Sequence, residues 1–378
     1  MSSSIYLDYN ATTPAAPGVV EEMLPWFVDR FWNASSSHPS GRVAAAAVEA
    51  GRERVAGLIG ARSAEVVWTS GATEATNLAL KGLPPTGERR RVVTIATEHK
   101  ATLDTVAALE HGGTPVTVVP VETDGSLSLD RLHSELDGSV LVVSVMAANN
   151  ETGVVTDLPP VADMVHECGA LLHSDITQVV GKMPFSVSDS GIDLASLSSH
   201  KIYGPKGIGA LFVSRRVKLS PLIHGGGHEW GLRSGTLNVP GIVGFGTAAD
   251  LATASLETEV HRQGRLVRRM LEELRGHVGD VLQTTDAPLR LANTLNIRVV
   301  GADAEAVMAN APDVALSSGS ACTALVPSPS HVLLAMGFDR TAALECLRIS
   351  VGRPTMEQDV VAAAELLAAA ITRVRALS

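Results

Sequence analysis

The segment from Val140 to Gln178 decides the fold, and it reads VLVVSVMAANNETGVVTDLPPVADMVHECGALLHSDITQ. It opens with a β-branched apolar run, Val140–Val145, and closes on a second run, Ala170–His173. Between them, Val161–Glu167 has the periodicity of an amphipathic helix. Strands that are apolar throughout and are joined by helices are typical of parallel sheets buried on both faces. The segment therefore predicts a strand–helix–strand unit of an α/β protein.

The same alternation continues on both sides of this segment. Further strand-like runs and helical segments are Val92–Ile95, Leu103–Glu110, Val116–Val121, Leu129–Leu136, Leu194–Leu197 and Ala210–Val213. The sequence thus predicts an α/β fold with a mainly parallel central sheet. Ligands of such sheets bind at the carboxyl ends of the strands, so the residues after each run are the first candidates for a site.

The two ends of the chain have a different pattern of predicted helices and strands. An Ala-rich helix is predicted over Arg42–Ile59, a long charged helix over Ala248–His277 and a last helix over about Met356–Leu377. A strand is predicted at Thr294–Val300, followed by a Ser/Gly/Pro-rich stretch from Ser317 to Pro329. We expect residues 15–245 to form a large domain, and residues 1–14 and 246–378 to form a smaller α/β domain.

Composition excludes several classes of protein. Of the 378 residues, 45% are hydrophobic and 19% are charged, which is enough apolar material for a core and unlike a disordered chain. The net charge of -10 argues against direct nucleic-acid binding, which would call for a basic patch.

The cellular setting is also suggested by the sequence. An odd, low number of cysteines (Cys168, Cys322 and Cys346) argues against a disulfide scaffold and favours a reducing compartment. No signal peptide and no apolar stretch long enough to cross a bilayer is recognised. We expect a cytoplasmic protein without a membrane partner.

The turn after the strand-like Val66–Trp68 is rich in small residues, Thr69-Ser-Gly-Ala-Thr-Glu-Ala-Thr-Asn77. Small residues let backbone amides approach a ligand, and a helix N-terminus favours an anion. Ala72 and Thr73 are therefore candidates for holding a phosphate. A helix start capped by Thr73 or Ser70 explains the same segment without a ligand.

Two charged residues follow apolar runs directly. Asp175 ends a strand, where a carboxylate needs a partner such as a protonated pyridine nitrogen, although it could instead cap the next helix. Lys201 follows Leu194–Leu197 beside Ser198 and His200, and a buried lysine of lowered pKa forms a Schiff base with an aldehyde. The alternative for Lys201 is a surface lysine, which is how we interpret Lys206 in the next Gly/Pro turn.

A third kind of candidate is a cysteine in a loop. Cys322 lies in Ser317-Ser-Gly-Ser-Ala-Cys-Thr323, whereas Cys168 and Cys346 lie in apolar surroundings typical of packing cysteines. A loop cysteine of this kind is a candidate nucleophile, with an incidental loop thiol as the alternative. No spacing of His, Cys and carboxylates indicates a metal site.

Together and in this order, the motifs resemble the class V aminotransferases of PLP-dependent fold type I, and specifically the cysteine desulfurases. The likeness covers essentially the whole chain and rests on several strings that must all fall in order. They are Tyr6-Leu-Asp-Tyr-Asn-Ala-Thr-Thr-Pro14, Thr69–Glu74, Thr97-Glu-His-Lys100, Asn149-Asn-Glu-Thr-Gly153, the segments around Asp175 and Lys201, His224–Thr236, Ser317–Thr323 and Leu347-Arg-Ile-Ser-Val-Gly352.

The resemblance implies a cofactor, pyridoxal 5′-phosphate (PLP). Lys201 would carry it through a Schiff base and move the substrate α-proton, and His99 would stack on the ring. Asp175 would pair with the ring nitrogen and Gln178 with the ring hydroxyl. The phosphate ligands implied are Ala72, Thr73, Ser198, His200 and, from the partner subunit of a homodimer, Thr236.

The resemblance also implies the reaction. Asn150 and Arg348 would hold the carboxylate of L-cysteine, and Arg can do so bidentately. Cys322 would take the substrate sulfur as a persulfide, leaving alanine, and would pass it to a sulfur-acceptor protein. A selenocysteine lyase or an aminotransferase-like enzyme is the alternative among enzymes. A non-catalytic module that binds a sulfur-handling partner is the alternative outside them.

Overall fold

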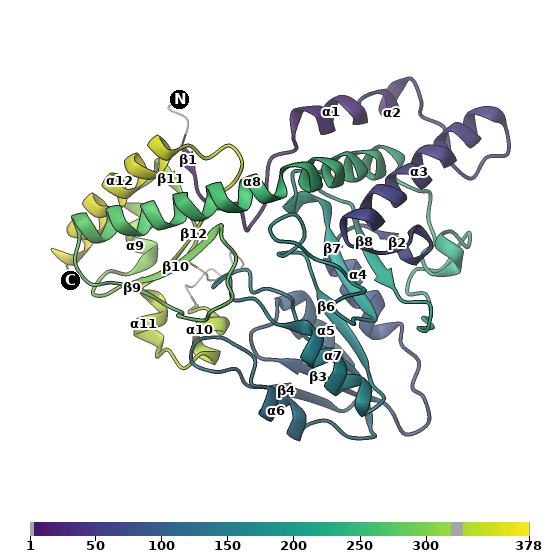
Figure 1. Ribbon diagram of the computed structural model, residues 1–378, viewed down its shortest axis with the longest axis horizontal. Coiled ribbons are helices and arrows are strands. Elements are labelled where there is room, and N and C mark those ends of the chain that lie inside the picture. The colour runs from purple at the N-terminus through teal and green to yellow at the C-terminus, as the bar shows by residue number, and fades with distance from the viewer. Residues whose placement is uncertain (1–3, 319–327, 378) are drawn as a thin grey trace.

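The computed structural model describes residues 4–318 and 328–377. Its central sheet has seven strands in the order β2-β8-β7-β6-β5-β3-β4 (Figure 1). The strands are β2 (Val66–Thr69), β3 (Arg91–Ile95), β4 (Val116–Val119), β5 (Val140–Ser144), β6 (Leu171–Asp175), β7 (Leu194–Ser198) and β8 (Gly209–Val213). Only β8 runs against its neighbours, so the prediction of a mainly parallel sheet is confirmed.

Helices cover both faces of this sheet. They are α1 (Pro17–Met23), α2 (Pro25–Val28), α3 (Pro39–Leu58), α4 (Ala72–Lys81), α5 (Lys100–His111), α6 (Leu129–Ser134) and α7 (Leu158–Glu167). Alternate strand residues enter different cores: Trp68 and Val93 lie in one, Val67 and Val92 in another. This two-sided burial is the reason that the strands read as unbroken apolar runs.

The rest of the chain forms a smaller body with two sheets. An antiparallel sheet contains β9 (Val281–Gln283), β10 (Thr294–Val299) and β12 (Cys346–Ser350), and β1 (Ile5–Tyr6) pairs with β11 (Val314–Ala315). The helices are α9 (Ala304–Ala309), α10 (His331–Ala335), α11 (Arg340–Leu344) and α12 (Glu357–Arg375), and the short 3₁₀ turns of the chain are η1 (Ser63–Glu65), η2 (Ser199–Lys201) and η3 (Glu229–Gly231).

One helix, α8 (Val239–His277), runs along both bodies (Figure 1). Its first part, with Phe245, lies in the core of the large body, and its later part, with Met270, lies in that of the small one. The expected division at residue 245 falls inside this continuous helix and stays a prediction.

By length and composition α8 could cross a membrane, which the sequence analysis did not expect. Its most apolar window has a mean hydropathy of 1.2, but 56% of that window is buried in the protein. Within the described residues α8 is a core helix, because it packs between the two bodies rather than presenting an apolar surface all round.

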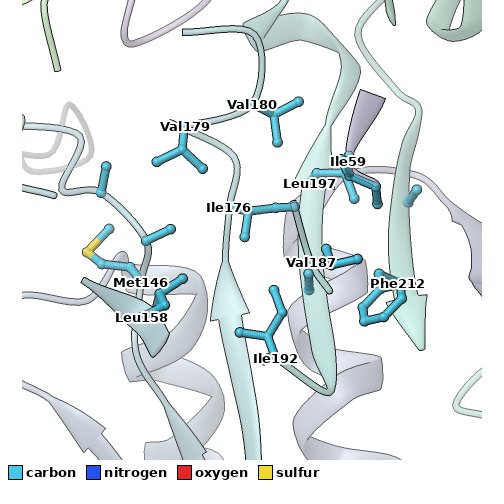
Figure 2. Packing of buried hydrophobic residues seen from close by; sticks show 14 of the residues in the cluster. Ile59, Met146, Leu158, Ile176, Val179, Val180, Val187, Ile192, Leu197 and Phe212 are labelled. Carbon is cyan, nitrogen blue, oxygen red and sulfur yellow. The ribbon is translucent and has the colours of Figure 1, made fainter. Parts of the chain in front are cut away.

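The apolar residues that follow β6 hold its carboxyl end, where Asp175 lies. Ile176, Val179 and Val180 follow β6 directly and lie in the large core (Figure 2). Burying an aliphatic side chain stabilises a fold by roughly 1.5–3 kcal/mol, so these three fix the end of β6 firmly. The edge where Asp175 lies is therefore a rigid part of the molecule.

Candidate active site

A pocket of about 850 Å³ lies at the carboxyl edge of the central sheet, between the two bodies. It collects ten of the predicted residues from eight places in the chain. They are Ala72, Thr73, His99, Asn150, Asp175, Gln178, Ser198, His200, Lys201 and Arg348. Thr236 is exposed and is not among the described residues that line this pocket, and Cys322 falls outside the described residues.

The phosphate cradle begins at α4. The N-cap, Gly71, supplies no side-chain hydrogen bond, so the first amides of the helix keep their donors for another partner. A Cβ on Gly209 of β8 would come within 2.6 Å of Gly71 Cα, so two glycines let the strand and the turn meet. Ser198 lies opposite, with its hydroxyl 3.9 Å from where a Cβ on Gly71 would stand. The geometry leaves an anion-sized cradle.

His200 closes this end of the pocket. Its Nδ1 lies 3.0 Å from Thr12 Oγ1. Desolvation, followed by the neighbouring charges of Lys201 and Lys206, lowers the pKa of His200 to about 4. A ring that is neutral at physiological pH binds a phosphate by hydrogen bonding rather than by charge.

Lys201 ends the short turn η2, directly after β7. Its Nζ donates to the carbonyl oxygens of Asn10 at 2.5 Å and Ala11 at 2.8 Å. Desolvation, reinforced by Arg348 and opposed by Asp175, lowers the pKa of Lys201 to about 8. Its amine is thus far more often neutral, and nucleophilic, than that of an ordinary lysine.

Asp175 is the last residue of β6 and is buried. Its Oδ1 accepts from the backbone N–H of Thr177 at 2.9 Å, so one oxygen organises the turn that follows. The residue also lines the pocket. The structure thus joins the two interpretations of the sequence, because Asp175 shapes the next turn and faces a ligand space at once.

His99 caps the N-terminus of α5. Its Nδ1 accepts from Ala101 N at 3.1 Å, so the neutral ring carries its proton on Nε2. Although the ring is exposed towards the pocket, the protein around it lowers the pKa of His99, chiefly through desolvation. A neutral imidazole fixed in one tautomer can stack on an aromatic ring. It takes up a proton only when a negative group nearby stabilises the charged form.

Arg348 enters from β12 of the small body. Its Nη2 donates to Asp8 Oδ1 at 2.6 Å and its Nη1 to the carbonyl oxygen of Asn150 at 3.1 Å. Among the described residues its buried Nε has no hydrogen-bond partner. Arg348 lines the pocket, and Nη1 and Nη2 each keep a second hydrogen, so this guanidinium is suited to a carboxylate.

The sequence analysis missed several residues of the pocket. Asp8 and Asn10 lie in the matched N-terminal string but were given no role, and Glu151 follows Asn150 directly. Lys206 is exposed as expected, yet it lines the pocket as well. No local signal marks these residues, because only the approach of the two bodies brings them together.

Glu74 is a further lining residue, on the first turn of α4. Its carboxylate accepts from Arg233 Nε at 2.8 Å and from Ser70 N at 2.7 Å. The pair ties the Gly-rich segment that follows His224 to the cradle. It also neutralises a carboxylate that would otherwise repel a phosphate.

Comparison with known proteins identifies the family. A sequence profile described as aminotransferase class-V matches residues 5–362. The chain belongs to the class-V aminotransferases. It is 47% identical over 388 residues to the cysteine desulfurase of Frankia sp. (strain EuIK1), covering 99% of this chain and 93% of that one. It is also 47% identical to the cysteine desulfurase IscS of Anaeromyxobacter sp. (strain Fw109-5), covering 100% of this chain and 95% of that one.

A solved structure agrees. A NifS-like protein superposes with a TM-score of 0.91 at 34% identity, covering 98% of this chain and 100% of the other. The resemblance to cysteine desulfurases drawn from the sequence motifs is therefore confirmed, as is the α/β fold.

Class-V aminotransferases are PLP enzymes, and the pocket residues fit that cofactor. An uncapped helix N-terminus with a serine hydroxyl opposite suits a phosphate. A lysine of lowered pKa suits an aldehyde, and a buried carboxylate suits a pyridinium nitrogen. The phosphate, aldehyde and ring nitrogen of PLP would each find a chemically matching group among the residues that line this one pocket.

Proposed function

We propose that the chain is a PLP-dependent cysteine desulfurase, which converts L-cysteine to L-alanine and takes the sulfur onto Cys322. The observation that carries this is the position of Lys201, whose amine shares a pocket with Asp175 and Arg348. When bound, PLP supplies an electron sink that weakens bonds at the substrate α- and β-carbons.

The residues of the chain divide the remaining work. The cradle of Ala72, Thr73, Ser198 and His200 would hold the phosphate, with Thr236 of a second subunit completing it. Gln178 would hold the ring hydroxyl and Asp175 the ring nitrogen. Arg348 and Asn150 would orient the substrate carboxylate, which places the α-proton within reach of Lys201 Nζ.

Proton and sulfur transfer then follow from the same groups. Lys201 Nζ would take the α-proton and return a proton to the product, and His99 Nε2 would assist on the other face. The Cys322 thiolate would form an S–S bond with the substrate sulfur as the Cβ–S bond breaks. The electron pair of that bond stays with the carbon fragment, which gains a proton and leaves as alanine, while the sulfur stays on Cys322 as a persulfide.

We further propose a homodimer that hands the persulfide sulfur to an acceptor protein. Apolar side chains of α1, α2 and the following turn are exposed, including Val28 at 73% and Phe31 at 72%. A patch of that kind is typical of an interface. A reducing, cytoplasmic setting suits a persulfide carrier, and Cys168 and Cys346 are free thiols.

The deciding experiment incubates the purified protein, loaded with PLP, with L-cysteine and a mild thiol reductant. Equal amounts of alanine and sulfide are expected. Lys201→Ala serves as the control, because it removes the amine, and far-ultraviolet circular dichroism checks that the variant is folded. A yellow, PLP-loaded protein that yields neither product would overturn the proposal, and equal turnover of the Lys201→Ala variant would overturn the role of that lysine.

A further inference from the structure

Lys182 is a lysine behind the pocket that the reaction described above does not use. It lies in the turn after β6, four residues beyond Gln178. Its Nζ donates to Gln178 Oε1 at 2.5 Å and to Asn10 Oδ1 at 2.9 Å. Among the described residues no carboxylate forms an ion pair with it. A partly buried ammonium without an ion pair is costly, so the presence of a lysine here calls for an explanation.

Among the described residues, Gln178 and Asn10 are the groups that accept a hydrogen bond from Lys182. The small cavity beside it, of about 20 Å³, is large enough for a single water. Desolvation, followed by repulsion from Lys201 and Arg348, lowers the pKa of Lys182 well below the usual lysine value. The two side-chain amides are therefore the fixed acceptors of this amino group.

Contact with a lysine decides which way an amide points. Gln178 Oε1 faces Lys182 and accepts from Nζ, and this amino group donates in both of its hydrogen bonds within the described residues. The nitrogen, Nε2, then points the other way, where it donates one hydrogen to Asn10 O at 3.1 Å. Its second hydrogen has no acceptor among the described residues, and Gln178 lines the pocket.

The same carbonyl links Gln178 to the reactive lysine. Asn10 O accepts from Gln178 Nε2 and from Lys201 Nζ. The Asn10 side chain is fixed in its turn, because Oδ1 accepts from Lys182 and from Asn293 while Nδ2 donates to Thr294. Reversing either amide would set two donors against each other, so Lys182 specifies one arrangement of the whole group.

We propose that Lys182 is a positioning residue, which holds the Gln178 amide so that its N–H faces the ring hydroxyl of PLP. The inference rests on the proposed function, because it needs PLP in this pocket. A ring oxygen that accepts hydrogen bonds is matched by Nε2 and would be repelled by Oε1 of a reversed amide. Lys182 thus acts on the cofactor through Gln178, without touching it.

The test compares two ligands on apo protein. One is PLP, and the other is 3-deoxypyridoxal 5′-phosphate, which keeps the aldehyde and phosphate but lacks the ring hydroxyl. Lys182→Met removes the donor and keeps a similar side-chain length, and Lys218→Met removes an exposed lysine outside the site as the matched control. Binding is followed by the absorbance of the lysine linkage, and far-ultraviolet circular dichroism reports folding.

Lys182→Met should weaken PLP binding roughly ten-fold and leave the binding of the 3-deoxy analogue unchanged. The reason is that the lost hydrogen bond goes to the ring hydroxyl, which only PLP has. Lys182→Arg, which also only donates, should restore PLP binding. In a Gln178→Met background, Lys182→Met should have no further effect.

Equal weakening of both ligands would assign Lys182 to general support of the pocket, and no weakening of either would remove it from the site; each result overturns the proposal. If Lys182→Met does not fold, Lys182→Gln replaces it in the same comparison, with a smaller selective loss expected. Failure of the wild-type protein to form any linkage with PLP would instead refute the proposed function.

Discussion

Substitution of Arg348 tests most directly how the pocket binds the carboxylate of its substrate. Its Nη2 donates one hydrogen to Asp8 and its Nη1 one to Asn150 O, which leaves the second hydrogen of each nitrogen as a donor for a ligand in the pocket. A substrate carboxylate would thus gain at least one strong charge-assisted hydrogen bond. Such a bond stabilises a complex by about 1.5–3 kcal/mol. Arg348→Met should therefore raise KM for L-cysteine about 10- to 150-fold.

The same substitution should change Lys201. Arg348 is the largest charge lowering the pKa of Lys201, so its removal should move that pKa upwards from about 8. At pH 8 about half of the Lys201 amines are neutral in the wild type, and the fraction falls as the pKa rises. The rate at which apo protein forms its linkage with PLP should then reach its plateau at higher pH in Arg348→Met.

Arg348→Lys separates the two effects. A lysine keeps the charge but lacks the planar fork, so the pH profile of linkage formation should stay near that of the wild type while KM rises. Initial rates of alanine formation give KM, and stopped-flow absorbance of apo protein mixed with PLP between pH 6.5 and 9.5 gives the profile. A KM within about two-fold of wild type in Arg348→Met would refute the assignment of the carboxylate to this residue.

Other predictions concern one residue each. Lys201→Ala should abolish the borohydride-reducible linkage to PLP; if mass spectrometry still finds it, another lysine carries the cofactor. Cys322→Ala should stay yellow but release no sulfide, and normal turnover would remove this thiol from the reaction. Asp175→Ala should weaken PLP retention and α-proton exchange together, and retention of both would contradict its pairing with the ring. Burial raises the pKa of Glu151 to about 7, so the folded protein loses stability as pH rises from the unfolded value of 4.5 towards 7. The side-chain amide of the Glu151→Gln variant stays neutral, so the unfolding free energy of this variant, measured in urea, should rise relative to that of the wild type between about pH 5 and 7. A difference that stays constant with pH would contradict the raised pKa of Glu151.

The strands of the central sheet could be predicted because their signal is local. Each is an unbroken apolar run, and β3, β5 and β7 agree with the predicted runs to within a residue at either end. The start of α8 could not be predicted from the sequence, and the expected Ala248 lies nine residues after the observed Val239. Pro240 and glycines 241, 244 and 246 read as a loop, because glycine is a poor helix former.

Packing overrides that propensity in the first turns of α8. A Cβ on Gly246 would stand 2.9 Å from Gly51 Cα of α3, and a Cβ on Gly51 would stand 2.8 Å from Ile242. The two helices touch backbone to backbone, which only glycine permits. The residues that weaken the local signal are thus those that the tertiary contact requires.

The site residues also differ in whether a local sequence signal marks them. Asp175, Lys201 and Thr73 each follow a strand, so topology alone predicts that they meet at one edge. Asp8, Asn10 and Lys182 have no such signal, since their role arises from side chains that meet across long sequence separations. Cys322, predicted from its loop and from the family resemblance, and Thr236, implied by the resemblance, stay predictions.

The charges around the pocket connect ligand binding with the reactivity of Lys201. Desolvation, followed by repulsion from neighbouring cations, lowers the pKa values of Lys182 and Lys201, and Arg348 is one of those cations for both lysines. Asp8 pairs directly with Arg348 alone, and Asp175 opposes the shift of Lys201 only in part. A ligand that brings a phosphate and a carboxylate adds negative charge beside these desolvated cations, where each interaction is stronger than in solvent. Arg348, the charge that adds to desolvation in lowering the Lys201 pKa, thus also favours the binding of an anionic cofactor and an amino acid.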